Sequence, residues 1–175
     1  MEKYEYKPLA ERYIRLLKLK PGGDGDLHCE LIPVSLDKLP KYVALSYSWD
    51  GQAPTAKILC HEKSLLVTPN CEAALRQLRQ GRDSRLVWID AICIDQSSIL
   101  ERNQQVTHMG EIYTKARRVA VWLGEGSPET AVAFLYIDRV AMTALMLRRD
   151  LQDRMLDLQI KRFKGMNVYF LSRQC

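Results

Sequence analysis

The first forty residues contain two short apolar stretches, at residues 13–20 and 27–34. The segment between them, Pro21-Gly-Gly-Asp-Gly-Asp26, is rich in glycine and aspartate, which accept the backbone angles of tight turns. Two apolar stretches joined by such a turn are typical of a β-hairpin. The pattern therefore predicts an antiparallel hairpin that precedes the main sheet.

The segment Leu86–Ile94 is apolar at every position except Asp90. A continuous apolar run of this length is typical of a strand in a parallel sheet, because helices cover both faces of such a strand. Shorter apolar runs predict the other strands of the sheet, at residues 42–49, at residues 119–123 and twice within residues 57–67.

Capping residues mark the starts of two helices between these strands. Thr68 followed by Pro69 supplies a side-chain cap and a proline at the first helical position. Ser98 and Glu101 have the spacing of a capping box. The buried stripe of the second helix is expected at apolar positions three and four residues apart, namely Val106, Met109, Ile112, Tyr113 and Ala116.

From residue 42 onward strands and helices alternate, which predicts an α/β fold with a parallel sheet and helices on both faces. Ser127 and Pro128 mark the start of a long C-terminal helix that is expected to run to about residue 163. We interpret residues 1–175 as a single domain with an N-terminal hairpin extension (1–40), an α/β core (41–137) and a C-terminal helical tail (138–175).

Composition and charge exclude several classes of protein. Apolar residues make up 47% of the chain and charged residues 27%, as in ordinary globular domains. The net charge is +5, but residues 139–175 carry eight basic and three acidic side chains, so the excess lies in the tail. That distribution disfavours a nucleic-acid surface on the core. The longest apolar stretch, 131–147, is interrupted by two charges, and no membrane span is expected.

The five cysteines also limit the chemistry. Their number is odd and no Cys-x-x-Cys occurs, which indicates the reduced thiols of a cytoplasmic protein. The cysteines and histidines lack the spacing of zinc ligands, so no metal site is expected. Cys93 and His108 are a disfavoured pair of nucleophile and base, because isoleucines flank Cys93 and indicate a buried, inert thiol.

Polar residues cluster where the predicted parallel strands end. Right-handed crossovers bring the carboxyl ends of parallel strands to one edge of the sheet, and open α/β sheets bind ligands at that edge. The ligand-binding or site-shaping residues expected there are Ser46, Trp49, Asp50, Asp90, Asp95, Gln96, Arg102 and Gln105.

Each carboxylate near this edge has two interpretations. Asp90 either contacts a ligand or has a structural role, as a member of a buried ion pair or as an acceptor that fixes a loop. Its candidate partners are Arg102, which we predict to meet it at the carboxyl edge, and backbone N–H groups of a neighbouring loop. Glu101 is either a catalytic acid or the glutamate of the capping box. Glu125 and Glu129 either stabilise the start of the next helix or act as catalytic carboxylates. The residues alone leave these alternatives open.

These segments resemble the fungal heterokaryon-incompatibility (HET) domain over about residues 4–137. Asp50 stands where the family usually has glycine, and Asp95 where it usually has asparagine. The motifs that carry the resemblance are Tyr6–Leu9, Ile14–Leu17, Tyr42–Trp49, Leu86–Gln96, Glu101–Arg102, Gln105–Val106, Met109, Ile112–Tyr113, Ala116 and Val119–Gly124.

The resemblance implies a protein of fungal allorecognition, a form of innate immunity, that triggers programmed cell death through self-association or through a protein partner. HET domains are distantly similar to Toll/interleukin-1 receptor (TIR) domains, which have flavodoxin-like folds, assemble into signalling complexes and in some cases cleave NAD. The resemblance thus leaves a second function open, a glycohydrolase with NAD as its substrate and no resident cofactor. Its candidate catalytic residues are Glu125, Glu129 and Glu101, followed by Asp138.

Overall fold

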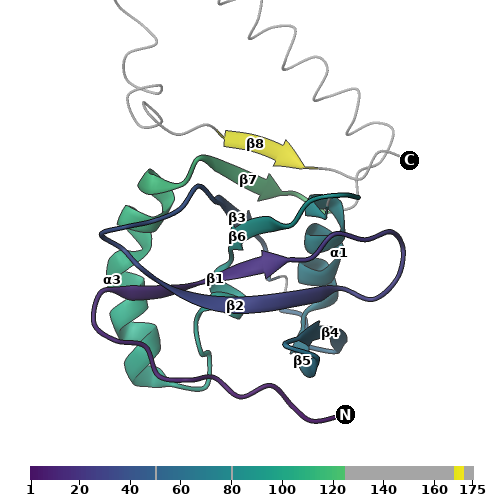
Figure 1. Cartoon of the computed structure of the whole chain (residues 1–175), viewed down its shortest axis with the longest axis horizontal. Helices are drawn as coiled ribbons and strands as arrows, with labels where there is room; N and C mark the ends of the chain where they lie inside the picture. Colours follow the sequence, from purple (N-terminus) through teal and green to yellow (C-terminus); the bar gives the residue numbers. More distant parts are fainter. Residues whose placement is uncertain (50, 80, 125–167, 172–175) are drawn as a thin grey trace, which may run out of the picture.

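A computed structural model describes residues 1–49, 51–79, 81–124 and 168–171, and its strands form one mixed sheet (Figure 1). The strand order is β5-β4-β2-β1-β6-β3-β7-β8. In chain order the elements are β1 (Tyr13–Leu19), β2 (His28–Ser35), β3 (Val43–Tyr47), β4 (Ala56–Cys60), β5 (Lys63–Val67), α1 (Pro69–Leu78), β6 (Arg85–Trp88), α2 (Asp90–Cys93), α3 (Ile99–Lys115), β7 (Arg118–Trp122) and β8 (Val168–Leu171).

The predicted N-terminal hairpin is confirmed, but it is built into the sheet. β1 and β2 pair antiparallel along their length, and β1 also pairs antiparallel with β6. Ile14, Leu16 and Leu17 are fully buried and Arg15 nearly so. Because successive side chains of a strand point to opposite faces, this burial means that both faces of β1 are covered. The hairpin therefore joins the central strands and does not stand before them.

The predicted parallel arrangement is confirmed for the strands that follow. β3 pairs parallel with β6 on one side and with β7 on the other, and β7 pairs parallel with β8. The antiparallel pairs β1–β2, β1–β6 and β4–β5 make the complete sheet mixed and not purely parallel. The chain order reverses at β3, because the strand that comes first in this parallel group lies between the second and the third.

Helices cover both faces of β3, as predicted. The Tyr47 hydroxyl lies 3.5 Å from Thr68 Oγ1 at the start of α1. Tyr42 and Ser46 occupy positions that alternate with Tyr47 along the strand. Tyr42 donates a hydrogen bond to the carbonyl of Ile112 in α3, and Ser46 hydrogen-bonds Tyr113 of the same helix. Since side chains alternate across a strand, α1 and α3 lie against opposite faces. Figure 1 shows them on opposite sides of the view.

The side-chain caps predicted at Thr68 and Ser98 are confirmed, but the return hydrogen bond from the Ser98 N–H to Glu101 that a capping box has is not formed. Thr68 Oγ1 accepts a hydrogen bond of 3.2 Å from the backbone N–H of Cys71, and Ser98 Oγ accepts one of 3.2 Å from Glu101. The prediction of the buried stripe of α3 is wrong at one position, because Val106 is 60% exposed and Gln105 is buried in its place. The Gln105 amide donates 2.9 Å to the carbonyl of Tyr13, which draws this face of α3 towards β1.

The prediction of one strand over Leu86–Ile94 is wrong. β6 ends at Trp88, and Asp90–Cys93 form the single turn α2, which packs against β1. One helical turn buries Ile92 and Cys93 as completely as a strand would have done. A short apolar run does not distinguish the two conformations, because burial on all sides removes the periodicity that separates strand from helix.

The predicted C-terminal helix and its start at Ser127 lie outside the described residues. Of the predicted helical tail (138–175) only residues 168–171 are described, and they form the strand β8 instead of a helix. Within the described residues, no helix is long and apolar enough to cross a membrane.

Candidate functional site

A cavity of about 470 Å³ lies at the carboxyl ends of β3 and β6. Four segments far apart in sequence form it: the N-terminal residues 3–6, the loop after β3, the strand β5, and the residues from α2 to 97. The N-terminal segment is held there by backbone hydrogen bonds between Tyr4 and Ser64 and between Ser64 and Glu2, each 2.8 Å. Three of the predicted site residues line the cavity, namely Trp49, Asp95 and Gln96.

The walls of this cavity are aromatic. The rings of Tyr47 and Trp49 are stacked with centroids 6.5 Å apart and planes at 17°. Tyr4 and Tyr6 meet edge to face with centroids 5.1 Å apart. Trp49 is 42% exposed, so part of its indole face is open to solvent. Flat, partly exposed rings bind planar apolar or heteroaromatic groups by stacking, and a cavity of this size holds a small molecule.

Asp90 lies beside this cavity, whose lining includes the carboxylates of Glu5 and Asp95. It is half-buried at the start of α2, next to the lining residue Ala91, whose backbone N–H donates 2.8 Å to its Oδ1. Burial raises the pKa of Asp90 above its ordinary value, although hydrogen bonds from Ala91 and from the Trp49 side chain partly oppose the rise. A carboxyl group with a raised pKa retains its proton longer and is suited to donate it to a bound ligand.

The predicted pair between Asp90 and Arg102 is wrong. Arg102 is exposed on α3, and among the described residues no ion pair joins it to Asp90. The prediction failed because it continued β6 to Ile94. In the structure the turn α2 begins at Asp90 itself, and backbone and indole N–H groups replace the arginine as its partners.

Asp95 and Gln96 shape the loop that forms one wall. Asp95 Oδ1 accepts hydrogen bonds from the backbone N–H of Ser97 at 3.0 Å and from the Ser97 hydroxyl at 2.6 Å, as in an Asx turn. Gln96 Nε2 donates 2.9 Å to the carbonyl of Asp90. Both residues therefore fix the loop while they line the cavity.

Glu101 lies in a buried ion pair. Arg15 donates to both carboxylate oxygens, at 2.5 and 3.0 Å, and the backbone N–H of Asp95 donates to Oε1 at 2.8 Å. The guanidinium also donates to the carbonyls of Cys93 and Lys7 and lies 5.0 Å from the ring centre of Tyr6. Glu101 therefore has a structural role, but the capping-box interpretation is wrong. Its three hydrogen bonds come from Arg15 and the Asp95 N–H, and the Ser98 N–H donates to the Asp95 carbonyl instead.

The other predicted site residues do not line the cavity, or they are not among the residues that the structure describes. Ser46 contacts Tyr113 of α3 on the face of the sheet that this helix covers. Gln105 is only 4% exposed, and its Oε1 lacks a hydrogen-bond partner among the described residues. Asp50, Glu125 and Glu129 fall among the residues that the structure does not describe. Within the described part of the chain, no cluster of side chains is suited to hold a metal ion.

Cys93 has the environment expected of an inert thiol. It is 1% exposed, and burial raises its pKa to about 12, so it does not form a thiolate at neutral pH. The four described cysteines, Cys29, Cys60, Cys71 and Cys93, are free and buried.

Asn70, Tyr4 and Tyr6 belong to the site but were not predicted from the sequence. Asn70 Oδ1 accepts 2.6 Å from the Trp122 indole at the end of β7, and its Nδ2 donates 2.7 Å to the carbonyl of Ser48 after β3. It thereby ties together two of the strand ends that form the edge. Tyr4 and Tyr6 are recognisable in the sequence as two aromatic residues within a polar N-terminal segment, but only the fold brings them to the cavity.

Two comparisons with known proteins agree with each other. The family model for heterokaryon incompatibility proteins matches residues 42–167. Heterokaryon incompatibility protein 6, OR allele, of Neurospora crassa is 35% identical over 127 residues, which cover 64% of this chain and 19% of that protein. The chain thus spans less than a fifth of the length of this curated relative. No solved structure matches the chain.

Proposed function

This chain belongs to the heterokaryon-incompatibility (HET) family, and on that premise we propose that it triggers programmed cell death in fungal allorecognition. The domain would act by self-association or by binding a protein partner that changes its assembly state. The free, buried cysteines are consistent with action in the cytoplasm, where thiols stay reduced.

The observation that carries the assembly mechanism is an exposed apolar patch on α3. Ile99, Leu100 and Val106 are 67%, 72% and 60% exposed. Ile99 and Val106 lie seven residues apart, which places them on the same face of the helix. Large apolar side chains that gather at one surface are typical of a protein–protein contact. We call these three residues the α3 patch.

Replacing the patch should prevent assembly and cell death together. We expect Ile99→Ser combined with Val106→Ser to weaken self-association about a hundredfold, because burial of each such side chain contributes about 1.5 kcal/mol or more. Sedimentation of the purified chain would measure assembly, and expression in a fungal host would measure death. Leu123→Ser, at an exposed apolar residue outside the patch, is the matched control. Cell death that persists in a strictly monomeric variant would contradict the mechanism.

We also propose that the parallel strands form a flavodoxin-like, TIR-like core. The order β6-β3-β7-β8 corresponds to 2-1-3-4 when these four strands are numbered along the chain, and this is the beginning of the flavodoxin-like order. Helices on both faces of β3 support the same proposal. In such sheets ligands bind where the strand order reverses, which here is the carboxyl end of β3, next to Trp49.

The aromatic cavity favours a second candidate function, cleavage of NAD. The exposed indole of Trp49 suits a heteroaromatic ring, and Asp90 stands beside it as a carboxyl group. Cleavage of the nicotinamide–ribose bond passes through an oxocarbenium-like state that a nearby carboxylate stabilises. Glu125 and Glu129 remain further candidates for that role.

The test is nicotinamide release from NAD by the concentrated chain, with and without a crowding agent that promotes assembly. On this second candidate we expect release above a buffer control, and Trp49→Ala should reduce it at least about tenfold by removing the stacking surface. Tyr13→Ala, at an exposed aromatic residue outside the cavity, should leave release unchanged. Absence of release under both conditions would rule against catalysis and leave the assembly mechanism standing.

A further inference from the structure

The lining of the cavity beside Trp49 carries more carboxylates than basic groups. Among the described residues that line it, Glu5 and Asp95 supply carboxylates, and Lys3 is the only one with a basic side chain. Asp90 adds a third carboxyl group beside the lining, where it accepts a hydrogen bond from the Trp49 side chain. This balance of charge suits a cationic ligand better than an anionic one.

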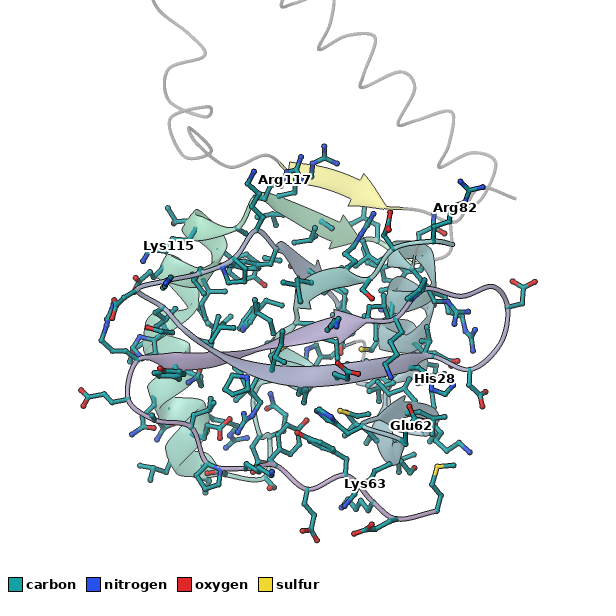
Figure 2. All side chains as sticks on the ribbon, in the orientation of Figure 1. His28, Glu62, Lys63, Arg82, Lys115 and Arg117 are labelled. Atoms are coloured by element: carbon teal, nitrogen blue, oxygen red, sulfur yellow. The ribbon has the colours of Figure 1, made fainter. Side chains whose placement is uncertain are left out.

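The basic residues next to the N-terminal segment do not reverse this balance. Lys63 of β5 forms an ion pair with Glu2, with Nζ and Oε1 3.0 Å apart, and it does not line the cavity. Arg15 is engaged by Glu101. Figure 2 shows Lys63 at the edge of the molecule where the N-terminal segment runs, and Arg117 at the opposite edge.

The start of α1, at the same edge of the sheet, has its donors occupied. The backbone N–H of Asn70 donates 3.0 Å to Gln52 Oε1, and that of Cys71 donates 3.2 Å to Thr68 Oγ1. The next N–H along the helix donates 3.0 Å to the Thr68 carbonyl, and Pro69 has no N–H. Helix starts bind phosphate through backbone N–H groups that point at the ligand, so this one is not prepared for a phosphate.

The aromatic walls supply the attraction for a cation. Two pairs of rings line the cavity, Tyr47 stacked with Trp49 and Tyr4 edge to face with Tyr6. The face of an aromatic ring is negative and attracts cations, most strongly in tryptophan. One such contact already exists here, because the Arg15 guanidinium lies 5.0 Å from the ring centre of Tyr6. The indole of Trp49 is 42% exposed and offers a further surface.

The polar groups of the walls favour a cation without N–H groups. Asp95 Oδ1 already accepts two hydrogen bonds from Ser97, and Gln52 Oε1 accepts one from the N–H of Asn70. A primary ammonium group carries three N–H donors and needs acceptors for them. A quaternary nitrogen has no donors, and aromatic rings bind it through their faces.

We propose that this cavity binds a small organic cation with a quaternary nitrogen, carried either by a trimethylammonium group or by an N-alkylated aromatic ring. The volume of about 470 Å³ suits a molecule of this size. Trp49 contacts the cation, and the carboxylates of Glu5 and Asp95 supply the opposite charge. The inference rests on the proposal that this cavity is the ligand site, but it does not require that the ligand is cleaved.

The test is calorimetric titration of the full chain with choline and with 1-methylnicotinamide, which represent the two sources of the cation. We expect saturable binding of one of them, at one molecule per chain. The uncharged analogues of the same shape, 3,3-dimethylbutan-1-ol and nicotinamide, should bind at least about tenfold more weakly. Ethanolamine, a primary ammonium, should also bind more weakly than choline. Tryptophan fluorescence locates the ligand, because Trp49 is exposed whereas Trp88 and Trp122 are buried.

Substitutions separate the contribution of the ring from that of the charge. Trp49→Leu should weaken cation binding at least about tenfold and leave the weak binding of the neutral analogues unchanged, and Trp49→Phe should retain part of the affinity. Glu5→Gln combined with Asp95→Asn should weaken cation binding about fivefold at low ionic strength. Glu11→Gln combined with Asp24→Asn is the control, since it removes the same charge from exposed residues that do not line the cavity.

Several outcomes would overturn the proposal. They are the absence of saturable binding of both cations, equal affinity for the cations and their neutral analogues, and tighter binding of ADP-ribose, which has two phosphates and no quaternary nitrogen. An equal loss of affinity in the Glu11 and Asp24 control would also overturn it, because it would indicate attraction by net charge alone. Cation binding without release of nicotinamide from NAD would support this inference and count against cleavage. Release without a preference for the cations would do the opposite.

Discussion

Arg15→Met is expected to lower the free energy of unfolding by about 3–5 kcal/mol, the usual cost of removing one member of a buried ion pair. The Arg15 side chain is 4% exposed and that of Glu101 is 12% exposed. Without the guanidinium, the Glu101 carboxylate keeps a single described donor, the N–H of Asp95, and the carbonyls of Cys93 and Lys7 lose theirs. Denaturation in urea, followed by circular dichroism, measures this change.

Arg12→Met is the matched control for that experiment. Arg12 pairs with Asp37 at 2.6 Å, close to the Arg15–Glu101 distance, but its side chain is 45% exposed and that of Asp37 is 65% exposed. Solvent screens such a pair, so its loss should lower the free energy of unfolding far less than the loss of Arg15 does. Similar losses in the two variants would contradict a special role for burial. Adding Glu101→Leu to Arg15→Met should recover part of the stability, because no buried charge then lacks its partner.

Asp90→Asn is expected to abolish cell death and leave the melting temperature unchanged or higher at neutral pH. Burial raises the pKa of Asp90, so the folded state binds the proton more tightly than the unfolded state does. Ionised Asp90 therefore destabilises the fold, and asparagine removes that cost while its carbonyl oxygen still accepts from Ala91 and Trp49. The loss of function would arise because asparagine can neither carry a charge nor donate an acidic proton to a ligand.

The same pKa shift predicts how the stability difference between the original chain and the Asp90→Asn variant changes with pH. Below the ordinary pKa of about 3.8, Asp90 is protonated in both states, and the chain and its asparagine variant should be equally stable apart from the substitution itself. As pH rises through the interval between the ordinary and the raised pKa, the original chain should lose stability relative to the variant. Melting curves of both proteins from acid to neutral pH measure the difference.

Asp24→Asn, at an exposed turn residue, is the control for the Asp90 experiment and should change neither death nor melting. A lower melting temperature in Asp90→Asn, together with loss of activity, would show that Asp90 is a structural acceptor and not a ligand-facing group.

Local features of the fold followed from the sequence alone. The glycine-rich turn after residue 20 joined β1 to β2, Thr68 and Ser98 capped their helices, and alternating strands and helices formed a parallel group around β3. These features depend on interactions between residues near one another in the chain or on general rules of connection, so residue type and spacing are enough to predict them. The edge where Trp49, Asp95 and Gln96 meet was predictable for the same reason.

Tertiary packing decided the rest. Residues 90–93 could extend β6 or form the turn α2, because either conformation buries the same apolar side chains. Their packing against β1 decides between the two conformations. Arg15 and Glu101 are 86 residues apart, and only the joining of β1 to β6 brings the guanidinium to the start of α3. The sequence does not show which acceptor a long polar side chain will bind, because many acceptors lie within its reach. The surrounding fold selects the partner, since a buried charge that is left unpaired costs free energy.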